Sequence, residues 1–219
     1  MFQRIVTQDG SVTYHNAQVD ATYRSVHGAE SESRHVFLRG TRLTRRPSPW
    51  RVLELGFGTG LSFAVTLRAA EEAGVELEFV SLEPNPLPRN LWLVPDEWKE
   101  SSLNAPFRIR GVTLTVIGKK WQEFEPEAGS FQAVYHDPFG PGAAPECWQV
   151  ECFGWSHQAL REDGILATFG ASSAARRAMK EAGFLVGSEA GAGGKREMTV
   201  ASKSAQAIAE AKPWKRGKD

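Results

Sequence analysis

Short apolar runs alternate with longer amphipathic stretches along the chain from Trp50 onward. A run of a few apolar residues between turn residues is typical of a buried strand, and apolar residues that repeat every three to four positions are typical of a helix. Strands are predicted at 51–55, 77–83, 112–117, 131–137, 164–169, 184–189 and 196–202, and helices at 61–73, 86–100, 146–161 and 172–182. This alternation predicts an α/β fold with a mostly parallel sheet covered by helices on both faces.

The pattern changes toward both ends of the chain. Residues 1–47 are polar and rich in turn residues, and Pro47 and Pro49 separate them from the first strand. We therefore predict an N-terminal extension (1–47), one α/β domain (48–203) and a basic, flexible tail (204–219). Near the end of the domain, two apolar segments face each other across a glycine-rich turn, which predicts a closing hairpin.

The tail combines basic residues with one aromatic residue, namely Lys212, Trp214, Lys215, Arg216 and Lys218. Such a run is typical of a frayed, solvated chain end. An arm that touches phosphate is the alternative.

Composition narrows the class of protein. The chain has 219 residues, enough for one domain with a substantial core, and its 26 basic residues balance its 26 acidic ones. Total charge therefore does not indicate a nucleic-acid binder, although local patches can still bind phosphate. Cys147 and Cys152 form neither a disulfide framework nor a four-ligand zinc site, so we expect idle thiols and no metal. Without a signal peptide or a bilayer-spanning apolar run, the chain is expected to be soluble and cytoplasmic, with no membrane partner.

A glycine-rich turn follows the first predicted strand of the α/β domain. Gly56, Gly58 and Gly60 permit unusual backbone angles and let a ligand lie against the main chain. The next predicted strand ends in an acid, Glu83, at a distance that suits a ribose hydroxyl. The pattern predicts a cofactor that carries a nucleoside, and a tight strand-to-helix turn without a ligand is the alternative.

The spacing of the glycines favours one cofactor over another. Dinucleotide-binding dehydrogenases have two residues between the second and third glycine, whereas here Thr59 alone separates Gly58 from Gly60. Glu54 would face anionic phosphates in a dehydrogenase, but a carboxylate suits the cationic amino and sulfonium groups of S-adenosylmethionine. S-adenosylmethionine is the predicted cofactor.

A candidate reaction centre follows the fourth predicted strand, where Asp137, Pro138 and Phe139 are consecutive. Ligands of open α/β sheets lie at the carboxyl ends of strands, so Asp137 is expected beside the glycine turn. Its carboxylate would accept hydrogen bonds from an amine, Pro138 would stiffen the loop, and Phe139 would stack on a base or a cation. Turn capping by Asp137 and core packing by Phe139 are the alternatives. His136 is predicted to be a strand residue.

Taken together, these residues resemble the MnmC-like tRNA methyltransferase family over nearly the whole chain. The matching motifs occur in the family's order, at 9–11, 22–23, 27–29, 32–38, 54–60, 137–139, 145–148, 167–169, 176–177, 181–184 and 194–198.

The resemblance implies a Rossmann-like class I methyltransferase fold, with a seven-stranded, mostly parallel sheet whose last strand is antiparallel. It implies methylation by S-adenosylmethionine of the aminomethyl group on position 5 of the tRNA wobble uridine. It also implies the standalone form, without the FAD-binding oxidoreductase of two-domain members. The implied site adds Phe57 and Asp137 to the cofactor residues and makes Asp137 and Phe139 catalytic. It assigns substrate binding to a set of five residues: Pro138, Phe139, Trp148, Lys195 and Arg196.

Two positions depart from the family pattern. The family usually has Gly-Asp after the third strand, where this chain has Gly118 and Lys119. The acid that holds the adenine end is therefore absent or replaced by Gln122 or Glu123. Arg24 stands where many relatives have histidine, so no role is carried over to it.

Basic residues occur in small groups, at 39–46, 119–120, 176–180 and 195–196. Groups that converge around Asp137 would form a footprint for tRNA phosphates, and a flipped wobble base would then stack on an aromatic side chain. Trp121 and Trp148 are the tryptophans expected near the pocket. Two alternatives remain: a methyltransferase for another amine, and a non-catalytic scaffold that keeps the cofactor fold.

Overall fold

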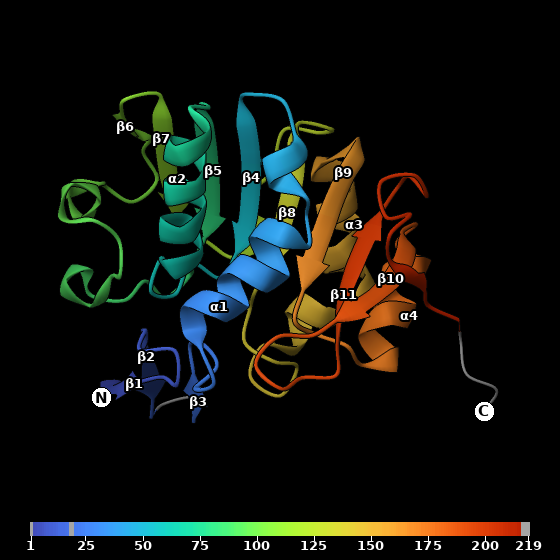
Figure 1. Cartoon of the computed structure of the whole chain (residues 1–219), viewed down its shortest axis with the longest axis horizontal. Coiled ribbons are helices and arrows are strands. Elements are labelled where there is room, and N and C mark those ends of the chain that lie inside the picture. Colours follow the sequence, from blue (N-terminus) through green and yellow to red (C-terminus); the bar gives the residue numbers. More distant parts are fainter. Residues whose placement is uncertain (1, 18–19, 216–219) are drawn as a thin grey trace.

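The computed structural model describes residues 2–17 and 20–215, which form two sheets and the helices that cover them (Figure 1). The helices are α1 (Ala29–Ser33), α2 (Leu61–Ala73), α3 (Val150–Ala159) and α4 (Ser173–Glu181). A small sheet contains β1 (Phe2–Val6), β2 (Val12–Asn16) and β3 (Ala21–Thr22). The large sheet contains β4 (Trp50–Leu55), β5 (Leu77–Leu82), β6 (Phe107–Ile109), β7 (Val112–Ile117), β8 (Phe131–His136), β9 (Leu160–Thr168), β10 (Leu185–Ala190), β11 (Glu197–Ser202) and β12 (Lys212–Pro213).

The large sheet has the order β12-β10-β11-β9-β8-β4-β5-β7-β6. β4 pairs in parallel with both β5 and β8, whereas β11 pairs antiparallel with β9 and β10. The predicted parallel sheet, the antiparallel last long strand and the closing hairpin are therefore confirmed. The expected number of seven strands is too small for this sheet, because the short strands β6 and β12 extend its two edges.

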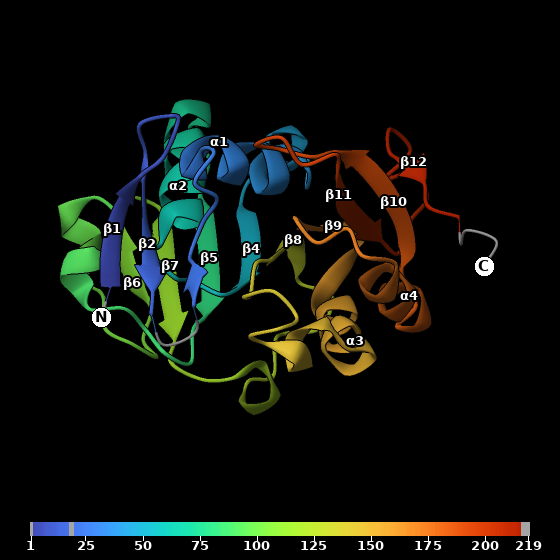
Figure 2. The same cartoon turned by 90° about the horizontal axis from the view of Figure 1, so that it is seen from below.

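The sheet has a hydrophobic core on each face, and the helices separate accordingly (Figure 2). α1 and α2 lie on one face, and α3 and α4 lie on the other. Neighbouring residues of β4 point to opposite cores: Val52 packs on the α2 side and Leu53 on the α3 side. Because both faces of β4 are buried, its apolar residues Trp50, Val52, Leu53 and Leu55 do not alternate with polar ones.

The predicted helix at 86–100 is wrong. This segment contains only short 3-10 turns, at Arg89–Leu91 and Asp96–Glu100. Pro86, Pro88 and Pro95 remove backbone donors and constrain the preceding residue, so a continuous helix cannot form. Buried Trp92 and Trp98 hold the segment against the core instead.

The described part of the tail packs on the domain. Ile208 and Ala211 are buried, and Lys212 pairs with Ser188 of β10. Residues 204–215 are therefore attached to the domain at these points, although most of their side chains are exposed, and the flexible tail stays a prediction. Arg216 and Lys218, on which the alternative of a phosphate-touching arm also rested, lie outside the described residues.

Segments before residue 47 also contribute to the core. A short π-helix, Arg34–Arg39, follows α1, and its Val36 and Phe37 are buried in the core on the α2 side. The β1–β3 sheet lies at the carboxyl ends of the parallel strands (Figure 1). The division of the chain at residue 47 stays a prediction.

Candidate functional site

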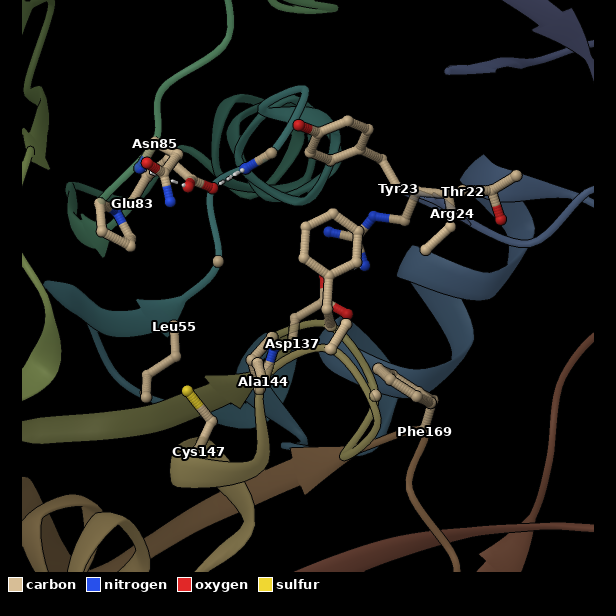
Figure 3. Close-up of a pocket in the computed structure, with 18 of the residues that line it drawn as sticks. Thr22, Tyr23, Arg24, Leu55, Glu83, Asn85, Asp137, Ala144, Cys147 and Phe169 are labelled. Atoms are coloured by element: carbon tan, nitrogen blue, oxygen red, sulfur yellow. Dashed lines mark hydrogen bonds and ion pairs between the residues drawn. The ribbon is translucent and has the colours of Figure 1, made fainter. Parts of the chain in front are cut away.

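A cavity of about 730 Å³ lies at the carboxyl ends of β4, β5 and β8. The order of the sheet reverses between β4 and β8, because the chain runs outward through β5 and β7 and then returns to β8. Such a switch point opens a crevice in α/β sheets, and ligands bind there. Residues 20–26 and the loop after β9 complete the cavity. Figure 3 shows Glu83 and Asn85 on one side and Arg24, Asp137 and Phe169 on the other.

One wall of the cavity is built from the glycine turn after β4. We call it the cofactor wall, and it contains Leu55, Gly56, Gly58, Thr59 and Glu83. Gly56 has a φ of 90°, and a Cβ on it would lie 2.5 Å from the backbone oxygen of Asp137. A side chain there would push the β4 and β8 loops apart, so glycine is required.

Glu83 joins the ends of β4 and β5. Its carboxylate accepts hydrogen bonds from the backbone N–H groups of Gly58 at 2.9 Å and Asn85 at 3.1 Å. Burial raises the pKa of Glu83, and these two bonds oppose that change. The carboxylate lines the cavity with lone pairs remaining, as expected for a group that holds ribose hydroxyls.

Glu54 lies behind the cofactor wall and is not among the described residues that line the cavity. It is completely buried, and its Oε2 accepts a hydrogen bond from Ser81 at 2.7 Å. Burial raises its pKa to about 7. Two polar atoms at this wall, Glu54 Oε1 and Thr59 Oγ1, are buried without a hydrogen-bond partner among the described residues. Thr59 lines the cavity, so its unsatisfied hydroxyl beside a bare glycine backbone fits a polar ligand such as the predicted cofactor.

Asp137 lies at a second wall, which meets the cofactor wall at Gly56, and its carboxylate forms an ion pair with Arg24. Both side chains are buried, at 6% and 4% exposure. Burial raises the pKa of Asp137 well above its ordinary range, and the charge of Arg24 opposes that change. A carboxylate with a raised pKa accepts protons more readily near neutral pH, which suits a general base.

Arg24 was not assigned a role from the sequence. Its Nη2 donates a hydrogen bond to Ser62 at 2.7 Å and lies 3.8 Å from Glu54 Oε1, so its guanidinium connects the carboxylates of both walls. The ring of Phe37 lies 5.3 Å from the guanidinium carbon. The one sequence signal that could have pointed to Arg24 was its position as a charged residue directly after the Thr22–Tyr23 motif. Only the folded chain brings that segment next to the end of β8.

Aromatic rings and one further ion pair complete the wall around Asp137, which we call the acceptor wall. Tyr23 and Phe139 lie with ring centroids 5.2 Å apart. Lys195 Nζ lies 4.7 Å from the centroid of the Phe169 ring and 2.8 Å from Glu32 Oε2. The described residues that make up this wall are Tyr23, Arg24, Glu32, Asp137, Pro138, Phe139, Phe169 and Lys195.

Several residues of the predicted site do not line the cavity. Phe57 is buried against Trp92, with ring centroids 4.6 Å apart, and Gly60 makes room for the Phe57 ring. Trp148 lies beneath the acceptor wall and donates a hydrogen bond from Nε1 to the Phe139 carbonyl at 2.8 Å. Arg196 is exposed and, within the described chain, does not line the cavity. All four assignments stay predictions.

The far end of the cavity is lined by Lys119, Lys120, Trp121 and Gln122. Of the two proposed replacements for the family's acid, Gln122 lines the cavity, whereas Glu123 accepts a hydrogen bond from the Lys120 backbone. Cys147 also lines the cavity, and Cys152 is buried beside it.

Most of the other basic groups are neutralised by acids. Arg42, Arg45 and Arg46 pair with Glu189, Glu210 and Asp163, and Arg176 pairs with Glu197. Among the described members of the basic groups named from the sequence, those that line the cavity are Lys119, Lys120 and Lys195. Over the described residues, no cluster of histidine, cysteine and acidic side chains could hold a metal ion, and no helix is long and apolar enough to cross a membrane.

Comparisons with known proteins agree with this geometry. A protein from Ralstonia nicotianae, named tRNA 5-methylaminomethyl-2-thiouridine biosynthesis bifunctional protein MnmC, is 33% identical, with 91% of this chain and 35% of the relative covered. A protein of the same name from Chromohalobacter salexigens is 30% identical, with 80% of this chain and 29% of the relative covered. The chain thus spans about a third of the length of these curated relatives.

A solved structure, that of MNMC2 from Aquifex aeolicus, superposes with a TM-score of 0.80 at 26% identity, covering 99% of this chain and 79% of that one. The predicted class I methyltransferase fold and the family resemblance are confirmed. Residues 95–204, half of the chain, match a family described as S-adenosyl-L-methionine-dependent methyltransferase. The chain therefore belongs to this methyltransferase family, and its cofactor is S-adenosyl-L-methionine.

Proposed function

We propose that the protein methylates the aminomethyl group at position 5 of the tRNA wobble uridine, giving 5-methylaminomethyluridine or its 2-thio form. The names of the MnmC relatives support the substrate. The single observation that carries the proposal is the acceptor wall. It sets buried carboxylates and aromatic rings in the same cavity as the cofactor wall, which is what a cationic amine on a planar base requires.

The cofactor wall fits S-adenosylmethionine. Glu83 would hold the ribose, the bare backbone at Gly56 and Gly58 would let the cofactor lie close, and Glu54 would compensate its positive charge from behind the wall. When bound, the cofactor supplies an activated methyl group on a sulfonium. Methyl transfer then depends on holding the acceptor in line more than on acid catalysis.

Proton removal is the step for which the chain must supply a group. An alkylammonium with a pKa near 10.4 is neutralised at pH 7 at a cost of about 4–5 kcal/mol. Asp137 would orient the aminomethyl group through hydrogen bonds and receive or relay its proton. Its raised pKa, caused by burial, supports this role, and Phe139 would stack on the base.

Lys119, Lys120 and Lys195, which line the cavity, would contact tRNA phosphates. Binding through a few phosphates implies affinity that falls steeply with salt.

The test is incubation with labelled S-adenosylmethionine and tRNA that carries the aminomethyl nucleoside. We expect label in the tRNA, and none when the wobble uridine lacks the aminomethyl group. Transfer to other amines but not to this tRNA would indicate a methyltransferase for another substrate. Cofactor binding without transfer to any acceptor would indicate the non-catalytic scaffold. Either outcome contradicts the proposal.

A further inference from the structure

Two ion pairs lie at the acceptor wall, and they differ in how tightly the cation is held. In each pair the carboxylate is buried, with 6% exposure for Asp137 and 5% for Glu32. The cations differ sharply: the Arg24 side chain is 4% exposed, whereas the Lys195 side chain is 43% exposed.

Arg24 cannot leave its carboxylate at low cost. Its guanidinium also bonds to Ser62, lies near Glu54 and packs over Phe37. Moving it would leave two buried carboxylates without a cation, which is strongly unfavourable. The negative charge of Asp137 is therefore permanently compensated from within the protein.

Lys195 can leave Glu32 far more easily. It follows a glycine-rich turn, in which Gly193 and Gly194 have positive φ angles, and its ammonium already borders solvent above the Phe169 ring. A flexible lysine that moves to another anion keeps its charge hydrated. Glu32, by contrast, would remain as a buried carboxylate facing the cavity, and such a group strongly favours a replacement cation.

We propose that the Lys195–Glu32 ion pair is a latch that the substrate opens: Lys195 moves to a tRNA phosphate, and the freed Glu32 carboxylate binds the cationic aminomethyl group. This assigns Glu32 as the residue that selects an amine over a neutral group. The inference rests on the proposed function for the identity of the substrate. It goes further by naming the group that recognises the charge and the event that exposes it.

The experiment compares wild type, Glu32→Gln, Lys195→Met and the double variant. Each is bound, with S-adenosylhomocysteine present to prevent turnover, to tRNA carrying either aminomethyluridine or hydroxymethyluridine, over a range of salt concentrations. Lys99→Met and Asp96→Asn serve as matched controls, because the Lys99–Asp96 pair has the same 2.8 Å separation and lies outside the cavity. Thermal unfolding establishes that every variant is folded. The double variant carries no unpaired buried charge and covers the case in which a single variant fails to fold.

Wild type is expected to bind the aminomethyl tRNA about 10-fold or more tightly than the hydroxymethyl tRNA, which is the size of effect expected for a hydrogen bond to a charged group. Glu32→Gln is expected to abolish that preference. Lys195→Met should keep the preference and lower the slope of log affinity against log salt by about one. The double variant should show both changes, namely the lost preference and the lower salt slope. The two control variants should show neither change. Retention of the preference by Glu32→Gln, or an unchanged salt slope in Lys195→Met, would overturn the latch. Methyl transfer by wild type tests the proposed function separately, so the two can fail independently.

Discussion

The two walls of the cavity are assembled in different ways. The cofactor wall comes from two neighbouring strands, and the backbone of one glycine turn and the carboxylate of Glu83 form most of it. The acceptor wall is made by side chains that are far apart in sequence: Glu32 meets Lys195 across 163 positions, and Arg24 reaches Asp137. The shape of a wall made of backbone depends on the backbone conformation. The charge of a wall made of ion pairs depends on which partners are present. Substitutions should therefore affect the two walls differently.

The largest effect is expected from Gly56→Ala. The added Cβ would meet the Asp137 carbonyl at 2.5 Å, at a φ of 90° that alanine rarely adopts, so unfolding free energy should fall by about 3 kcal/mol or more. Chemical denaturation and cofactor titration measure the loss. Gly154→Ala is the control, because the Cβ position in α3 is open and alanine favours a helix, so that variant should be as stable as wild type or slightly more. Equal stability of the Gly56 variant would show that the walls do not meet at this backbone contact.

Asp137→Asn should separate the acceptor wall from the cofactor wall. The amide keeps the shape of the side chain but cannot accept the proton, so kcat should fall about 10²-fold or more while cofactor affinity stays close to that of wild type. Single-turnover kinetics and cofactor titration provide the two readouts. Glu146→Gln changes another carboxylate that lines the cavity and should leave kcat unchanged. Unchanged turnover in the Asp137 variant would remove this residue from the mechanism.

Stability should depend on pH through Glu54. Because burial raises its pKa from 4.5 to about 7, the folded chain holds a proton that the unfolded chain has lost between these values. The contribution of Glu54 to unfolding free energy therefore falls as pH rises through this range, by about 3 kcal/mol in total. Glu54→Gln should show a flatter profile than wild type in denaturation at a series of pH values from about 5 to 8. Parallel profiles would show that Glu54 does not titrate in this range.

The smallest effect is expected from Trp148→Phe. The variant loses the Nε1 hydrogen bond to the Phe139 carbonyl, worth about 1 kcal/mol, so KM for tRNA should rise a few-fold with cofactor affinity unchanged. Trp50→Phe loses a similar bond, to the Arg46 carbonyl at 3.0 Å, at the other end of β4, and should not alter KM. The same KM change in both variants would mean that Trp148 contributes stability alone and does not position Phe139.

Local patterns predicted the fold wherever one signal dominated. Helix α2 occupies the predicted residues 61–73, because an apolar periodic segment lies between Gly60 and Gly74, both in left-handed conformations. The segment at 86–100 carried a similar apolar pattern, but its prolines prevent a helix, and burial of Trp92 and Trp98 replaced helical hydrogen bonding as the ordering force. The described tail was judged by its charge, yet Ile208 and Ala211 decide where it packs.

The sequence by itself determined the order of strands and helices, the glycine turn, Glu83 and the position of Asp137 at a strand end, because each depends on residues close together in the chain. Only the tertiary structure showed that Glu54 lies behind its wall, that Arg24 connects Glu54 to Asp137, and that Glu32 faces the cavity beside Lys195. The physical reason is that a charge becomes informative only with its partner and its burial. Both are set by long-range packing, which no local pattern contains.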